Sequence, residues 1–114
     1  MTVERSDLKP LEWLGTSRWV VHNWPKGART GTGSELLRVQ QGEEPSNWKP
    51  MTTVGEGVTE VRVSYDGNQY RVLYVAKFQK AIYVLHAFRK KTQKTPKWEL
   101  ELARRRYNSL SETQ

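Results

Sequence analysis

The sequence predicts an α+β fold: a small twisted antiparallel sheet, with helices near the N-terminus packed on it and one helix at the C-terminus. Residues 58–88 contain three apolar segments separated by short turns, which is typical of an antiparallel meander. Apolar residues also recur at helical spacing on both sides of that meander. A length of 114 residues is that of one domain, so residues 1–114 are assigned to a single domain.

The N-terminal region is predicted to hold one strand and one short helix. Residues 8–14 form the strand, with alternate apolar residues on a shared face. Thr16 and Ser17 are typical N-terminal caps, so we expect the helix to start there and to run to Asn23. The segment Trp24-Pro25-Lys26-Gly27 then breaks the chain.

A second helix is predicted over residues 28–41, with a start weakened by glycine. Its apolar residues keep helical spacing, and Gly42 is placed for a C-terminal cap. Residues 43–57 are polar and contain two Pro and two Gly, which predicts a loop. Trp48 and Met51 are expected to attach this loop to the core.

The second half begins with the three strands of the meander. Residues 58–64 alternate between apolar and polar side chains, and Asp66-Gly67-Asn68 is a strong hairpin turn. Residues 70–78 are apolar on both faces, which predicts a central strand buried on both sides. After a tight turn at residues 79–80, the third strand covers residues 81–88.

The last helix is predicted to open at Thr95-Pro96, with Thr95 as the cap and Pro96 at the first helical position. Its buried stripe is expected to comprise Leu100, Ala103, Tyr107 and Leu110. The three consecutive arginines at 104–106 are expected to point mostly outward.

The net charge of +7 lies entirely in the second half of the chain. Residues 1–57 hold seven basic and seven acidic side chains, whereas residues 58–114 hold twelve and five. This distribution favours a polyanionic partner. The chain has no cysteine, which excludes disulfides and thiolate metal sites, and the basic half has no clustered carboxylates for a metal nuclease. We therefore expect no cofactor and no metal. The first residues have no signal-peptide pattern and no apolar run is long enough to cross a membrane, so a cytoplasmic protein with no membrane contact is expected.

Two long strings of the sequence carry a family resemblance. They are KPMTTVGEGVTEVR at residues 49–62 and VLHAFRKKTQKTP at residues 84–96. Both resemble the phage-derived HigB-like branch of the RelE/ParE toxin superfamily, and the resemblance extends over about residues 9–110. It implies a RelE-like fold and the toxin of a type II toxin–antitoxin system. Such a toxin is an mRNA endoribonuclease (mRNA interferase) that needs no metal, usually acts on the ribosome, and causes growth arrest by inhibiting translation.

The resemblance also implies a partner. A HigA-like antitoxin with a helix-turn-helix domain would neutralise the toxin, and operator DNA would be bound only through that antitoxin. We expect an acidic segment of the antitoxin to cover the basic half of the chain, with an affinity that falls as salt rises.

RNA cleavage without metal needs a base for the 2′-hydroxyl, a cation for the phosphate and an acid for the leaving oxygen. The candidates for these roles are Arg62, Arg71, His86, Lys90 and Lys91. In the superfamily, an Arg in the context of Tyr70-Arg71-Val72 resembles the phosphate-contacting residue. His86 is expected to share a face with Val84 and Phe88, and histidine suits proton transfer near neutral pH. We expect these candidates to lie in one pocket.

A second group of candidates would bind RNA without taking part in the chemistry: Tyr74, Phe88, Arg89, Lys94 and Lys97. Phe88 could stack on a splayed base, and the cations could steer phosphates.

Each candidate also has a structural alternative. Arg71 could form a buried salt bridge with Glu60 or Asp66, and Arg62 could simply face solvent. His86 could be a hydrogen-bonded structural residue, and Phe88 and Tyr74 could belong to the core. Two functional alternatives also stay open. One is a ParE-like inhibitor of gyrase without RNA chemistry, and the other is a phage-derived RNA-binding or adaptor protein without toxicity.

Overall fold

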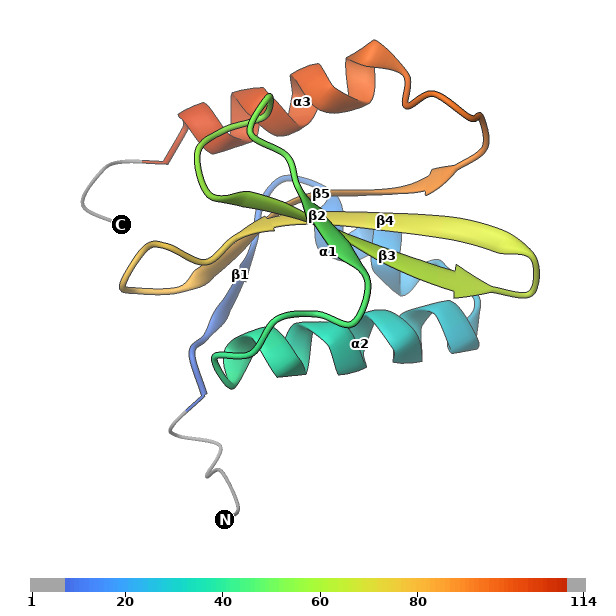
Figure 1. Cartoon of the computed structure of the whole chain (residues 1–114), viewed down its shortest axis with the longest axis horizontal. Coiled ribbons are helices and arrows are strands. Elements are labelled where there is room, and N and C mark those ends of the chain that lie inside the picture. Colours follow the sequence, from blue (N-terminus) through green and yellow to red (C-terminus); the bar gives the residue numbers. More distant parts are fainter. Residues whose placement is uncertain (1–7, 111–114) are drawn as a thin grey trace.

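The structure is a computed structural model that describes residues 8–110, and these form a sheet of five strands with helices on both of its faces (Figure 1). In chain order the elements are β1 (Leu11–Trp13), α1 (Ser17–His22), α2 (Lys26–Gln40), β2 (Trp48–Pro50), β3 (Val58–Tyr65), β4 (Asn68–Val75), β5 (Ile82–Lys90) and α3 (Lys97–Asn108). The fold is α+β and consistent with a RelE-like fold, as the sequence predicted. No helix of the described part has the length and apolar character that crossing a membrane requires.

The strand order across the sheet is β1-β5-β4-β3-β2. The three strands of the predicted meander pair antiparallel, whereas β1 pairs parallel with β5, so the sheet is mixed and not purely antiparallel. A parallel pair needs a long connection, and here all the other strands and both N-terminal helices lie between β1 and β5. The segment predicted as one loop also contains β2, a short edge strand paired with β3.

The hairpin between β3 and β4 is confirmed by its backbone angles. Asp66 has φ 51° and Gly67 has φ 76°, the left-handed values that a two-residue turn of type I′ requires. Asn68 already belongs to β4 and pairs with Tyr65. This turn sets the register in which Arg62 lies directly opposite Arg71.

Helix α2 begins at Lys26, two residues earlier than predicted, and directly follows Pro25. Gly27 has a packing reason to lack a side chain, because a Cβ atom there would lie 1.9 Å from the Tyr65 ring. At the other end of the chain, α3 is preceded by Pro96 and has no side-chain cap. The predicted cap at Thr95 and the helical position of Pro96 are therefore wrong by one residue.

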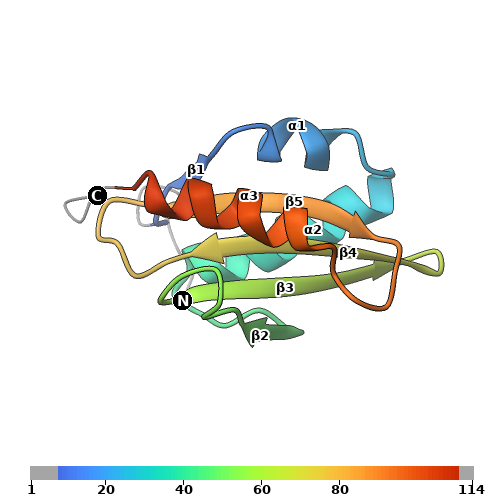
Figure 2. The same cartoon turned by 90° about the horizontal axis from the view of Figure 1, so that it is seen from above.

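Two apolar clusters occupy the two faces of the sheet. Figure 2 shows the helices that cover these faces, with α3 in front of the sheet and α2 behind it. On one face α2 packs against a cluster that includes Val61, Val63, Tyr70, Val72 and Tyr74. On the other face α3 covers a cluster that includes Val58, Leu73, Val75, Leu85 and Phe88. Strand β4 contributes to both clusters, which confirms a central strand buried on both sides. Met51 packs against the second cluster as expected, but Trp48 is exposed, contrary to the prediction.

A β-bulge interrupts the pairing of β4 with β5. Leu73 pairs with His86 while its neighbour Tyr74 pairs with Val84, so Leu85 has no partner in the register. The extra residue reverses the alternation of β5. Val84 therefore packs on the α2 face, whereas His86 faces α3. The expectation that His86 and Val84 share a face is wrong, because strict alternation does not continue through a bulge.

Candidate functional site

The α3 face of the sheet carries a row of charged residues across β3, β4 and β5. Arg62 lies opposite Arg71, and Arg71 lies opposite Phe88. The next row contains Glu60, Leu73 and His86, and Lys90 pairs with Gln69 at the far end. Because directly opposed residues share a face, four catalytic candidates lie on one side of the sheet: Arg62, Arg71, His86 and Lys90.

The Glu60 carboxylate forms an ion pair with each of the two arginines, Arg62 and Arg71. The buried Glu60 carboxylate accepts a hydrogen bond from Arg62 Nε at 3.3 Å and lies 3.8 Å from Arg71 Nε. Arg71 is only 7% exposed, and its Nη1 donates to the Tyr70 carbonyl. Burial lowers the pKa of Arg71, and Glu60 counters that effect. Arg71 is therefore paired with an internal acid and is not an open phosphate receptor.

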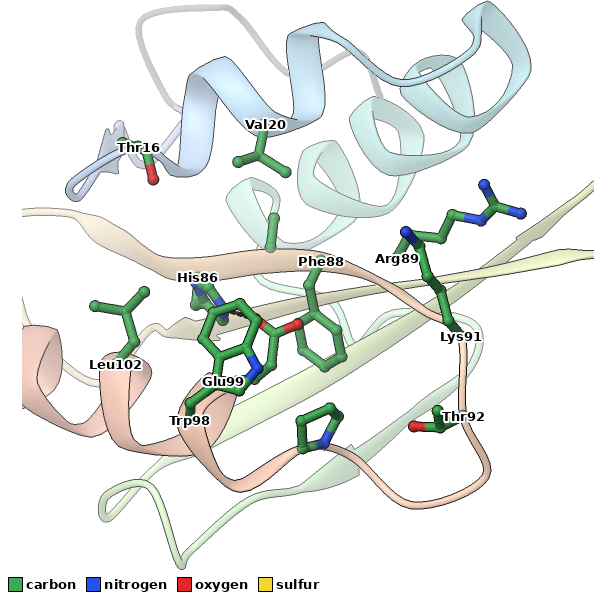
Figure 3. Close-up of a pocket in the computed structure, with 12 residues that line it drawn as sticks. Thr16, Val20, His86, Phe88, Arg89, Lys91, Thr92, Trp98, Glu99 and Leu102 are labelled. Carbon is green, nitrogen blue, oxygen red and sulfur yellow. Dashed lines mark hydrogen bonds and ion pairs between the residues drawn. The ribbon is translucent and has the colours of Figure 1, made fainter.

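A cavity of about 550 Å³ lies beside β5, between α1 and α3 (Figure 3). β1 pairs only with Ile82–Val84, so no strand of the described part covers the outer edge of β5 beyond Val84. The cavity occupies this position. Its walls are Thr16 and Val20 from α1 and its N-cap; His86, Ala87, Phe88 and Arg89 from β5; Lys91, Thr92 and Pro96 from the following loop; and Trp98, Glu99 and Leu102 from α3.

The cavity therefore does not contain all the residues expected to meet in one pocket. His86 and Lys91 line it, but Arg62, Arg71 and Lys90 do not. Arg62 and Arg71 belong instead to the group around Glu60, on the neighbouring strands β3 and β4. The sequence predicted one pocket, whereas the structure places these residues in two groups, one at the cavity and one around Glu60.

Glu99, His86 and Arg106 form a chain of hydrogen bonds at the cavity, in which Glu99 and His86 are buried and Arg106 is partly buried. His86 Nε2 lies 2.6 Å from Glu99 Oε1, and His86 Nδ1 lies 3.2 Å from Arg106 Nη1. A guanidinium can only donate, so His86 Nδ1 accepts and Nε2 carries the proton that it donates to Glu99. Burial lowers the pKa of His86, opposed by Glu99 and reinforced by Arg106. Both ring nitrogens are engaged.

Arg106 also corrects the expectation that residues 104–106 point outward. It donates to the Leu85 carbonyl and to Thr16 Oγ1, in addition to His86. Arg104 is exposed yet donates twice to the Thr53 carbonyl. The three arginines therefore differ, because only Arg106 lies on the side of α3 that faces β5.

The aromatic residues of the cavity differ in their accessibility. Phe88 is 5% exposed and stacks on the His86 ring, with centroids 5.5 Å apart and planes 26° apart. Trp98 is 60% exposed and meets His86 at 6.4 Å in an edge-to-face contact. Trp98, Glu99 and Arg106 were missed by the sequence reasoning. Residues 99 and 106 lie two helical turns apart, a spacing that placed them on one face of α3.

The remaining RNA-binding candidates are scattered. Tyr74 lies on the α2 face, where burial raises its pKa to about 12, so the structure separates it from the cavity. Arg89 lines the cavity and donates to Asn68 Oδ1 at 2.6 Å. Lys94 and Lys97 are exposed beyond the cavity, in the loop and at the start of α3. No three His, Asp or Glu side chains of residues 8–110 gather where they could hold a metal ion.

A comparison with protein families gives one match. The model described as Phage derived protein Gp49-like (DUF891) matches residues 20–108. This span includes the β5, loop and α3 walls of the cavity and the group around Glu60. No curated protein matches the chain.

Proposed function

Because this chain belongs to the Gp49-like family of phage-derived proteins, we propose that it is the toxin of a type II toxin–antitoxin pair and cleaves mRNA on the ribosome. The family is consistent with toxins of toxin–antitoxin systems in general. The nuclease activity and its dependence on the ribosome are proposals that go beyond the family. They are supported by the cavity, which combines exposed cations with a buried acid–imidazole pair.

The cavity, together with Lys90 beside it, offers groups for each step of a metal-independent cleavage. The 2′-hydroxyl loses its proton to a base and attacks the phosphorus, and the bond to the 5′-oxygen breaks as that oxygen takes up a proton. Glu99 is the base that the cavity presents, because both His86 nitrogens are already engaged. His86 holds the Glu99 carboxylate in place through Nε2, and Arg106 holds the His86 ring through Nδ1. The products would be a 2′,3′-cyclic phosphate and a free 5′-hydroxyl.

Lys91 lies on the cavity wall and is the cation that would stabilise charge on the phosphate oxygens. Lys90, next to it, would protonate the leaving oxygen. Arg62 on β3 and Arg71 on β4 lie outside the cavity and contribute positive potential to the same face of the sheet. A direct phosphate contact by Arg71 would require its ion pair with Glu60 to open.

The partner that we propose is a HigA-like helix-turn-helix antitoxin. It would place an acidic segment over the basic residues near the end of β5 and would contact operator DNA on behalf of the pair. Because this attraction is electrostatic, the complex should dissociate more readily as salt rises. Copurification that survives molar salt unchanged would contradict this part of the proposal.

The test of the nuclease proposal is primer extension on cellular mRNA after induction. Wild-type protein should produce new 5′ ends and arrest growth. Glu99→Gln and Lys91→Ala should each reduce these ends by at least about tenfold, since one catalytic group typically contributes about a hundredfold or more. Lys80→Ala is the matched control, since Lys80 is an exposed cation in the turn before β5. Unchanged cleavage in both cavity variants would refute the assignment.

One observation favours a second candidate, a ParE-like inhibitor of gyrase that binds without cutting RNA. The ion pair with Glu60 leaves Arg71 without an open phosphate contact, and a purely binding toxin would not need one. In that case induction should trigger an SOS response while transcripts stay intact. An adaptor protein without toxicity would instead give no growth phenotype on overexpression.

A further inference from the structure

Trp98 is an exposed aromatic residue on the wall of the cavity. It is the second residue of α3 and stands across the cavity from Val20 (Figure 3). Burial of an indole ring is energetically favourable. A ring that is left 60% exposed in a concave site is therefore available to a ligand. Phe88 cannot serve in its place, because it is almost fully buried and stacks on His86.

Cations border the same cavity. The side chains of Arg89 and Lys91 rise from the end of β5 and the start of the following loop, and both are exposed (Figure 3). Val20, Pro96 and Leu102 supply apolar surface in the same cavity. An apolar slot with one open aromatic face and cations at its rim matches a nucleotide, whose base has flat π faces that stack and whose phosphates are anionic.

We propose that this cavity is a subsite for one unpaired base of single-stranded RNA, with Trp98 as its stacking wall. Arg89 and Lys91 contact the flanking phosphates. The volume of about 550 Å³ lies within the usual range for small-ligand sites. An acidic peptide would also be attracted by the two cations, but it would leave the exposed indole face without a matching partner. The subsite rests on the proposed function for its choice of RNA.

The test is equilibrium binding of a short, single-stranded RNA that carries 2′-O-methyl groups and one fluorescent base analogue. Since the 2′-hydroxyl is blocked, the RNA cannot be cleaved and binding is measured alone. Trp98→Ala should weaken binding about tenfold or more, because stacking on one aromatic side chain contributes roughly 1–3 kcal/mol per base. Trp98→Phe keeps a ring and should stay within about threefold of the wild type.

Trp19→Ala is the matched control. Trp19 is 68% exposed and lies on α1 beside Arg18, so it resembles Trp98 in exposure and in charged surroundings. It does not line the cavity. Its removal should change the affinity less than about twofold, since an exposed ring outside a binding site contributes little. Circular dichroism and urea unfolding should be unchanged in both alanine variants.

Three results would overturn the subsite. Trp98→Ala could bind RNA like the wild type, both tryptophan variants could lose the same affinity, or an acidic peptide could bind in a Trp98-dependent manner while RNA does not. The nuclease proposal fails separately. If cellular mRNA stays intact but RNA binding depends on Trp98, the subsite stands without the cleavage. If mRNA is cut equally well by Trp98→Ala and RNA binding is unchanged, only the subsite fails.

Discussion

Both faces of the sheet are covered by a helix, but they differ in chemistry. The α2 face is mostly apolar, with valines and tyrosines of β3 and β4 packed against Ala28 and Leu36 of the helix. The α3 face also has an apolar cluster, and within it lie Glu60, Arg71 and His86, all buried.

The α2 face therefore contributes mainly to stability, whereas the α3 face carries the residues proposed for chemistry. A buried polar or charged group is costly unless it has a partner. Arg71 pairs with Glu60, and His86 is hydrogen-bonded to Glu99. The α2 face gives the apolar burial on which a stable sheet depends. Substitutions that affect only one face should therefore have distinct signatures.

The largest expected effect is the loss of apolar packing on the α2 face. Leu36→Ala removes a buried side chain and should lower the free energy of unfolding by about 3 kcal/mol. Leu37→Ala, the adjacent and partly exposed residue, should change it by less than about 1 kcal/mol. Urea unfolding followed by circular dichroism measures both. Equal losses would mean that α2 does not pack in the orientation described here.

The ion pairs of the α3 face should come next. Arg71→Ala leaves the buried Glu60 with only a partly exposed partner and should cost about 2 kcal/mol of unfolding free energy. Arg62→Ala should cost less than about 1 kcal/mol, because Arg62 is partly solvated and Glu60 keeps Arg71. The same urea titration tests the pair. A greater loss in Arg62→Ala than in Arg71→Ala would reverse the assignment of the buried partner.

The pH dependence of stability should distinguish the faces in a third way. Burial lowers the pKa of His86 below 6.5, so the unfolded chain takes up a proton before the folded chain does. The stability that the neutral His86 contributes is complete above pH 6.5. It is lost as the pH falls toward the lowered pKa of His86 in the folded chain. The free energy of unfolding, measured in urea, should be lower at pH 5.5 than at pH 7.5. This difference should be smaller in His86→Gln than in the wild type.

His22→Gln provides the control for that experiment. His22 is exposed on α1 and makes no contact with the Glu99 chain. The variant should keep the wild-type difference between pH 7.5 and 5.5. If both glutamine variants behave alike, the drop originates outside the α3 face.

The smallest effect is expected for Tyr74→Phe on the α2 face. The change removes one hydroxyl that is hydrogen-bonded to Thr59, so the free energy of unfolding should fall by about 1 kcal/mol or less. RNA cleavage should be unchanged, because Tyr74 packs in the apolar cluster under α2 and does not line the cavity. Cleavage assayed by primer extension that falls tenfold would show that the two faces are coupled.

Much of the fold was readable because it depends on local chemistry. Asp66 and Gly67 adopt the left-handed angles that their residue types favour, and the apolar run of β4 marks its burial on both sides. β2 was missed, since three exposed residues ending in Pro50 carry no strand pattern. The parallel pairing of β1 was also missed, because it joins segments about seventy residues apart.

The site was predicted in part for the same reason. Alternation along β3 placed Glu60 and Arg62 on one face, and the basic string after Phe88 indicated where cations gather. The partners of His86 could not be found this way. Glu99 and Arg106 reach it from α3, and the bulge at Leu85 turns His86 toward that helix.

The amino-acid sequence by itself determined the meander, its hairpin turn and the charge of its C-terminal half, because these depend on residue type and near-neighbour spacing. Only the tertiary structure decided which charges are paired and which aromatic ring stays open. Pairing and exposure depend on how α3 lies across the sheet, and that arrangement brings together residues that no local pattern connects.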